Sequence, residues 1–256
     1  MNWGIKVLLL LTVIPQVCFG FEMVKIPSGN LEPFWMIPRS TAGARKNKIE
    51  SYKVKSIMAM KYAVTKKDYL KFLEKNSKWQ KKNVVEIFAD EAYLKSFDGK
   101  PDRSPVTEIS WFAARAFCEY YKMRLPTLAE WEYMAAASET KADANKDEKF
   151  LRRILDWYGE PQSGKIKPVG SIYKNMYGLW DMHGLIWEWV EDFNSNFVTG
   201  ESREDSSFDK NMFCGGGGLS SANKEDYAAF MRFAFRSSLK GNSSAWNLGF
   251  RCVRSI

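Results

Sequence analysis

Apolar residues recur at helical spacing in three parts of this chain, each with a signal for where a helix begins or ends. Residues 65–68, Thr-Lys-Lys-Asp, form a capping-box pattern that predicts a helix directly after it. A second helix is expected through residues 113–120 and is stopped before Pro126. Residues 127–130, Thr-Leu-Ala-Glu, form another capping box, which predicts a helix that ends near Ser138.

Short apolar runs between these helices predict strands or extended segments at residues 23–26, 52–62, 187–189 and 247–254. Long polar segments predict loops at residues 39–50, 76–103, 139–149 and 194–209. The pattern contains neither sustained heptads nor a βαβ rhythm. We therefore expect one irregular α+β domain in which loops carry much of the structure.

The most informative stretch is residues 177–192, which holds three tryptophans, four acidic residues, two glycines and the only histidine, His183. Trp187 and Trp189 alternate around Glu188, a pattern typical of an extended segment with large aromatic side chains on both faces. This segment should therefore be buried on two sides.

Burying the carboxylate of Glu188 is costly unless it is paired or holds a cation. Asp181 lies seven residues earlier, across a turn marked by Gly184, and would bring a second carboxylate to the same place. Two carboxylates and the carbonyls of an irregular turn suit calcium, which takes 6–8 oxygen ligands. The alternative is that Glu188 accepts hydrogen bonds from backbone amides in a tight core turn. The spacing alone leaves both interpretations open.

Residues 1–20 predict a secretory signal peptide that is cleaved after Gly20. A basic residue, Lys6, precedes an apolar run over residues 7–14, which is too short to span a membrane. A lipoprotein anchor at Cys18 is less favoured, because no small residue directly precedes that cysteine. We expect a periplasmic or secreted protein without a transmembrane segment.

The chain carries a net charge of +8, and the basic excess is densest between Arg45 and Lys100. Nucleic acid is not expected as a partner, because the export signal argues against it and no arginine-rich or aromatic-interleaved motif accompanies the charge. A solvated basic face explains the excess better. Three cysteines remain after signal removal, Cys118, Cys214 and Cys252, and counting leaves open which two pair.

Several segments together resemble the formylglycine-generating enzyme family, also called the sulfatase-modifying factor family. Residues 124–133, RLPTLAEWEY, resemble its RLPTEAEWEY motif, and residues 177–189 resemble its YGLYDMxGNVWEW motif. Residues 247–252, NLGFRC, match its C-terminal motif, and residues 62–65 resemble its EVT segment. The resemblance assigns residues 21–256 to one loop-rich domain related to the C-type lectin fold.

The resemblance also implies a cross-link and a metal. It pairs Cys118 with Cys252 and leaves Cys214 as a free thiol. It implies structural calcium bound by four groups: the side chains of Asp181 and Glu188 and the backbone carbonyls of Gly184 and Ile186.

The family's catalytic groups are not matched. Its oxidases hold copper(I) with two cysteines that follow a Gly-Gly-Ser strand, and aligning Gly216–Gly218 with that strand places Ser221 at the first cysteine. Copper is therefore not expected, and the catalytic residues stay unknown. The iron-dependent branch needs three histidines, which this chain lacks, and neither haem nor nucleotide binding has support.

Part of the family's substrate groove persists at Trp187, Arg236 and Asn247, and Ser220 and Ser221 are expected to face it. A salt bridge for Arg236 and a turn cap for Asn247 are the structural alternatives. The resemblance favours an exported binding protein for a peptide, glycan or protein partner without copper-dependent oxidase activity. The alternatives are an extracytoplasmic enzyme that modifies a peptide or peptide-derived metabolite by another mechanism and, less favoured, a sulfatase-activating oxidase.

Overall fold

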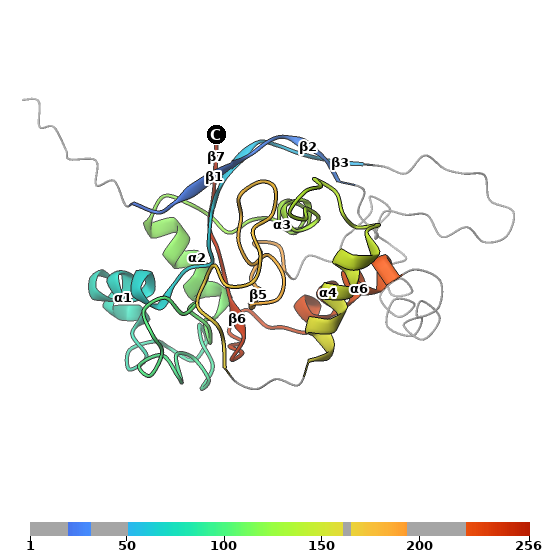
Figure 1. The fold of residues 1–256 in the computed structure, drawn as a ribbon. Helices are drawn as coiled ribbons and strands as arrows, with labels where there is room; N and C mark the ends of the chain where they lie inside the picture. The colour runs from blue at the N-terminus through green and yellow to red at the C-terminus, as the bar shows by residue number, and fades with distance from the viewer. Residues whose placement is uncertain (1–19, 32–50, 161–164, 194–223) are drawn as a thin grey trace, which may run out of the picture.

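A small antiparallel sheet joins the N-terminal and C-terminal parts of the described chain (Figure 1). The computed structural model describes residues 20–31, 51–160, 165–193 and 224–256. In the sheet, β1 (Met23–Ile26) pairs with β4 (Ile57–Met60), which pairs in turn with β7 (Val253–Ser255). Ala59, on the central strand, lies opposite Val253 and is fully buried.

Two smaller pairs of strands accompany this sheet in the described part of the chain. β2 (Gly29–Leu31) pairs antiparallel with β3 (Tyr52–Val54), and β5 (Trp187–Glu188) pairs parallel with β6 (Leu248–Gly249). The single strand expected over residues 52–62 is therefore two strands, because β3 and β4 take different partners.

The predicted capping boxes both form. Thr65 caps α1 (Lys66–Lys75) and Thr127 caps α3 (Leu128–Ala135), each with its side chain bonded to the backbone three residues on. α2 (Trp111–Tyr120) begins after Ser110. A short 3₁₀-helix, η2 (Ser77–Trp79), is the one helical piece in residues 76–103, which otherwise form turns and irregular segments as expected.

α4 (Glu148–Gly159) is a helix that was not predicted from the sequence. Asp147 begins it by accepting hydrogen bonds from the backbone of Lys149 and Phe150 at 3.1 and 3.2 Å. α6 (Lys224–Ser237) lies beside α4, on the opposite side of the molecule from α1 and α2 (Figure 1). None of the described helices is both long and apolar enough to cross a bilayer.

Two large groups of buried apolar side chains fill the fold. The first packs α1 and α2 against the C-terminal motif and includes Tyr69, Phe72, Phe117, Trp189 and Phe250. The second packs the three-stranded sheet against α3 and α4 and includes Ile57, Trp131, Met134, Ile154 and Val253. Residues 187–190, which we call the tryptophan segment, lie where these groups meet, with Trp189 in the first and Val190 in the second.

Candidate functional site

Backbone pairing holds the tryptophan segment against the C-terminal motif. The Trp187 N–H donates to the carbonyl of Asn247 at 2.8 Å, and the Trp189 N–H donates to that of Gly249 at 2.9 Å. On its other side Gly249 lies against the backbone of Val106, where a Cβ would come within 2.3 Å of the carbonyl oxygen, so the position requires glycine. Two of the predicted groove residues, Trp187 and Asn247, are thereby brought side by side.

The carboxylate of Glu188 is buried beneath this segment and paired with Arg251. Arg251 Nε lies 3.0 and 2.8 Å from the two carboxylate oxygens, and its Nη2 donates to Oε1 at 2.8 Å. Trp131 Nε1 donates to Oε2 at 2.8 Å. The Arg251 guanidinium also donates to the carbonyls of Met60 and Trp180, at 3.3 and 2.9 Å. All three guanidinium nitrogens of Arg251 and both carboxylate oxygens of Glu188 therefore have hydrogen-bond partners, which offsets the cost of burying the pair.

Asp181 sits at a tight turn, with a left-handed backbone of φ 59°. Its Oδ1 accepts from the Ile172 N–H at 2.8 Å, and its Oδ2 accepts from the Gly170 N–H. Burial raises the pKa of Asp181, although the two amide bonds oppose the rise. Asp181, and not Glu188, is therefore the carboxylate that accepts backbone amides in a core turn.

The two carboxylates that the resemblance assigns to calcium are engaged by donors of the protein itself. The oxygens of Asp181 face backbone N–H groups, and those of Glu188 are engaged by Arg251 and Trp131. A guanidinium therefore supplies the positive charge at Glu188 that the metal would supply. Within the described residues, no three His, Cys, Asp or Glu side chains converge to hold a metal. Calcium binding stays a prediction, against which this geometry argues.

A second buried ion cluster joins α3 to α6. Glu132 accepts from Arg232, at 2.9 Å from Nε to Oε1 and 2.6 Å from Nη2 to Oε2, and from Arg236 Nη1 at 3.1 Å. Arg236 also lies over the ring of Trp131, 4.4 Å from its centroid. Burial raises the pKa of Glu132, but the charges of the two arginines outweigh it and the net shift is downward. The salt-bridge alternative for Arg236 is thus observed, with Glu132 as partner.

Trp187 packs among the aromatic side chains of α4 and α6. The Tyr158 ring stacks on it at 5.1 Å between centroids, the Phe235 ring lies at 4.4 Å and the Trp157 ring at 5.3 Å. All four rings are half-buried. We call these four residues the aromatic group. Tyr158 links the group to the ion cluster, because its hydroxyl accepts from Arg232 Nη1 at 3.2 Å.

The chain matches the sulfatase-modifying factor enzyme 1-like domain over residues 16–256. It belongs to this family. It is 33% identical to a formylglycine-generating enzyme of Streptomyces coelicolor over 172 residues, which are 60% of this chain and 54% of that protein. It is 30% identical to the inactive C-alpha-formylglycine-generating enzyme 2 of Bos taurus over 160 residues, 58% of this chain and 50% of that protein. The chain spans about half the length of these curated relatives.

Two solved structures share the fold. PvdO from Pseudomonas aeruginosa aligns with a TM-score of 0.51 at 15% identity and covers 91% of this chain and 94% of its own. The variable protein 1 of Treponema denticola aligns with a TM-score of 0.52 at 17% identity, covering 92% and 95%. These likenesses confirm the expected α+β fold of the formylglycine-generating-enzyme type.

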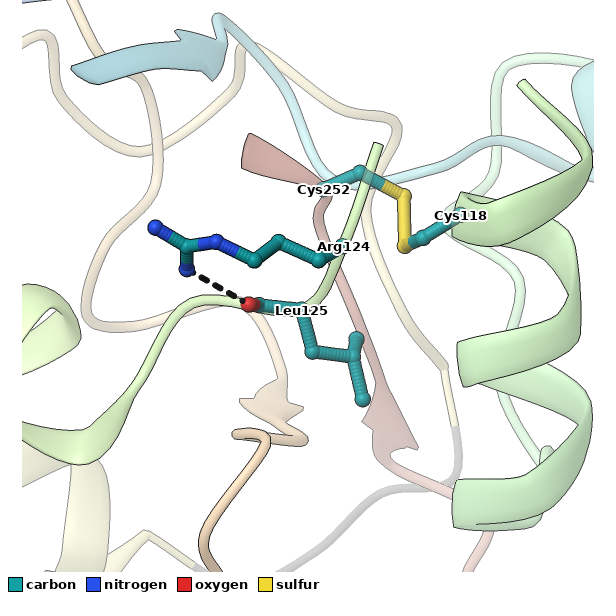
Figure 2. Close-up of a disulfide and its surroundings, with 4 residues drawn as sticks. All are labelled: Cys118, Arg124, Leu125 and Cys252. Atoms are coloured by element: carbon teal, nitrogen blue, oxygen red, sulfur yellow. Dashed lines mark hydrogen bonds between the residues drawn. A yellow bond between two sulfur atoms is a disulfide. The ribbon is translucent and has the colours of Figure 1, made fainter. Parts of the chain in front are cut away.

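The disulfide that membership of the sulfatase-modifying factor family implies is present between Cys118 and Cys252, with Cα atoms 5.6 Å apart (Figure 2). Next to it, the backbone of Arg124 pairs with Val253 in both directions, at 2.9 and 2.8 Å. The Arg124 side chain bonds the carbonyl of Leu125 at 3.1 Å. The disulfide therefore fastens the C-terminal end of α2 to the sheet. Ser220, Ser221, Cys214 and the glycine run lie outside the described residues.

His183, in the family's tryptophan motif, is buried and neutral. Its Nε2 lies 3.0 Å from the carbonyl oxygen of Ala135 and therefore carries the proton, while its Nδ1 has no partner within the described chain. Burial lowers the pKa of His183 to about 3, and the nearby charge of Arg232 acts in the same direction. A histidine in this state stays uncharged near neutral pH, and its bond to Ala135 joins the turn to α3.

This histidine should make the protein less stable in mild acid. The folded pKa of about 3 lies below the unfolded value of 6.5, so the contribution is intact above pH 6.5 and is lost as pH falls toward 3. By this linkage, His183 contributes about 2 kcal/mol less to the free energy of unfolding at pH 5 than it does well above pH 6.5. We expect His183→Gln to lose less stability than the wild type between pH 7.5 and pH 5, as measured by urea unfolding. Equal losses in both proteins would contradict this assignment.

Three residues of the site, Glu132, Arg232 and Arg251, were not predicted from the sequence. Signals for them do exist. Arg232 and Arg236 are four residues apart, so a helix over this segment places both on one face. Glu132 lies in the motif of residues 124–133 and Arg251 in that of residues 247–252. A motif does not specify which side chains contact each other.

Proposed function

We propose that this protein is an exported member of the sulfatase-modifying factor family that binds a peptide, glycan or protein ligand and lacks copper-dependent cysteine oxidation. The cysteine pairing carries this proposal. Residues 21–256 contain Cys118, Cys214 and Cys252, and the first and last are joined in the disulfide. One thiol is left, whereas the family's copper(I) site requires two soft thiolate ligands.

Two other observations support the loss of oxidation. Alignment of the glycine run places Ser221 at the first copper-binding cysteine, and a hydroxyl is a poor ligand for copper(I). In addition, one similar relative, from Bos taurus, is itself named as inactive. That name describes the relative, and it shows that members of this family exist without the family's activity.

The aromatic group supports ligand binding in the family's groove. Ligand sites are lined mostly by apolar and aromatic side chains with a few polar groups that fix orientation. Four half-buried rings lie here next to the backbone pair of Trp187 and Asn247, and Tyr158 links them to Arg232. Export is supported by the basic start and the apolar run over residues 7–14.

The test is a cysteine oxidation assay with copper(I) on a peptide that contains Cys-x-Pro-x-Arg, read by mass spectrometry. We expect no aldehyde above the level of a sample without protein. The Streptomyces coelicolor relative, assayed in parallel, should convert the peptide and so shows that copper loading and substrate are competent. Conversion of the peptide by the present protein would overturn the proposal.

A further inference from the structure

Among the described residues, the ion pairs between α3 and α6 join two positive charges to one negative charge. Two guanidinium groups, of Arg232 and Arg236, meet one carboxylate, of Glu132, and the three side chains are 7%, 4% and 9% exposed. A buried charge without a counter-charge is costly. Burial accordingly lowers the pKa of Arg236.

The excess is localised on one edge of Arg236. Its Nη1 donates to Glu132, whereas its Nε and Nη2 are buried and have no hydrogen-bond partner within the described residues. Asp192 is another carboxylate whose charge is felt at Arg236, but its Oδ1 accepts from the Leu128 N–H at 2.6 Å. Neither open nitrogen of Arg236 is bonded to it.

The open edge has the shape that binds a carboxylate. The N–H groups on Nε and Nη2 point in parallel, which matches the two oxygens of one carboxylate. Arg232 shows this geometry four residues earlier on the same helix, where its Nε and Nη2 bond the two oxygens of Glu132 at 2.9 and 2.6 Å. One further monoanion at Arg236 would leave the cluster with two positive and two negative charges.

We infer that Arg236 binds a carboxylate group of the ligand through its Nε and Nη2. This inference rests on the proposed function and names the ligand's chemistry. The ion cluster is joined to the aromatic group through Tyr158, and Phe235, next to Arg236 in the chain, contacts Trp187. A ligand in the groove would then place apolar parts near these rings and its carboxylate on Arg236.

The test uses sodium acetate, the smallest suitable carboxylate because Arg236 is buried, with acetamide as the matched neutral control. Nuclear magnetic resonance on the full protein follows the arginine Nε–H signals, assigned through the backbone. We expect the Arg236 signal to shift saturably with acetate and to stay in place with acetamide. The Arg232 signal, already bonded to Glu132, should move much less.

Arg236→Lys keeps the positive charge and removes the two-donor edge, so it should weaken acetate binding about tenfold or more. Unchanged affinity in this variant, an equal response to acetamide, or no saturable shift of the wild-type signal would overturn the inference. If the variant does not fold, the test rests on the wild-type signals alone.

Two further pairs of ligands distinguish a peptide carboxylate from an acidic sugar. Acetyl-dialanine is compared with its amide, and glucuronate is compared with methyl glucoside.

Failure of this inference and failure of the proposed function are distinguishable. Peptide oxidation with copper would overturn the function while leaving an acetate response at Arg236 in place. Absence of that response would remove the carboxylate site and leave the result of the copper assay unaffected.

Discussion

Replacing Glu188 by glutamine is expected to lower the free energy of unfolding by about 3–5 kcal/mol. Arg251 and Glu188 are both 0% exposed, so the change leaves a buried guanidinium without its counter-charge. Glutamine has nearly the same volume and can still accept from Trp131, so the loss reports on charge more than on packing. Urea unfolding followed by tryptophan fluorescence measures it.

The matched control is the same substitution at an exposed ion pair. Glu119 pairs with Arg115 one turn away on α2, with side chains 58% and 46% exposed. Glu119→Gln should cost about 0.5 kcal/mol or less, because exposed pairs gain little from their attraction. If both substitutions cost the same, burial does not determine the importance of the Glu188 pair.

A double variant distinguishes the loss of the ion pair from the cost of leaving the Arg251 charge buried without a partner. Glu188→Leu combined with Arg251→Met removes both ions together and should recover much of the stability lost in Glu188→Gln. A double variant as unstable as the single one would show that packing and the bonds to Met60 and Trp180 dominate at this position.

The same unfolding measurements address calcium. With Arg251 at Glu188, a chelator should leave the wild-type melting temperature unchanged, and added calcium should not raise it. A ligand that binds the folded state adds about 2.7 kcal/mol at a hundred times its dissociation constant. A clear rise with calcium would show that Glu188 exchanges Arg251 for the metal.

Local features of the fold were predictable where the sequence carries a local signal. Thr65 and Thr127 each cap a helix through a residue three positions on, so four residues contain the whole signal. α4 was not assigned, although Asp147 and the helical spacing of Phe150, Leu151 and Ile154 mark it. The break between β3 and β4 depends on partners in distant strands, which local pattern does not specify.

The candidate site shows the same division between local and distant information. That Glu188 needs a partner follows from its place between two tryptophans. That the partner is Arg251 does not, because 63 residues separate them and nothing in the spacing pairs them. Hydrogen bonds from backbone amides were one of two interpretations for the carboxylate of Glu188. They are found instead at Asp181, a residue with φ of 59°, whose carboxylate accepts from Gly170 and Ile172.

Loss of the disulfide is expected to destabilise the protein as much as Glu188→Gln, or more. Cys118 and Cys252 are separated by 134 positions, and in the chain-entropy account a loop of this length contributes about 5 kcal/mol by restricting the unfolded chain. For a domain of this size, that corresponds to a fall in melting temperature of roughly 10–20 °C. Thermal unfolding of the oxidised protein and of Cys118→Ala measures the difference.

Reductant supplies the control within the same experiment. It should lower the melting temperature of the wild type to that of Cys118→Ala and leave the variant unchanged, because the variant has no bond between α2 and the sheet to break. An equal fall of the melting temperature in both proteins would show that reductant does not act through the Cys118–Cys252 disulfide. If reductant, present throughout unfolding, left the melting temperature of the wild type unchanged, Cys118 and Cys252 would not be joined. The count of free thiols on which the proposed function rests would then be wrong.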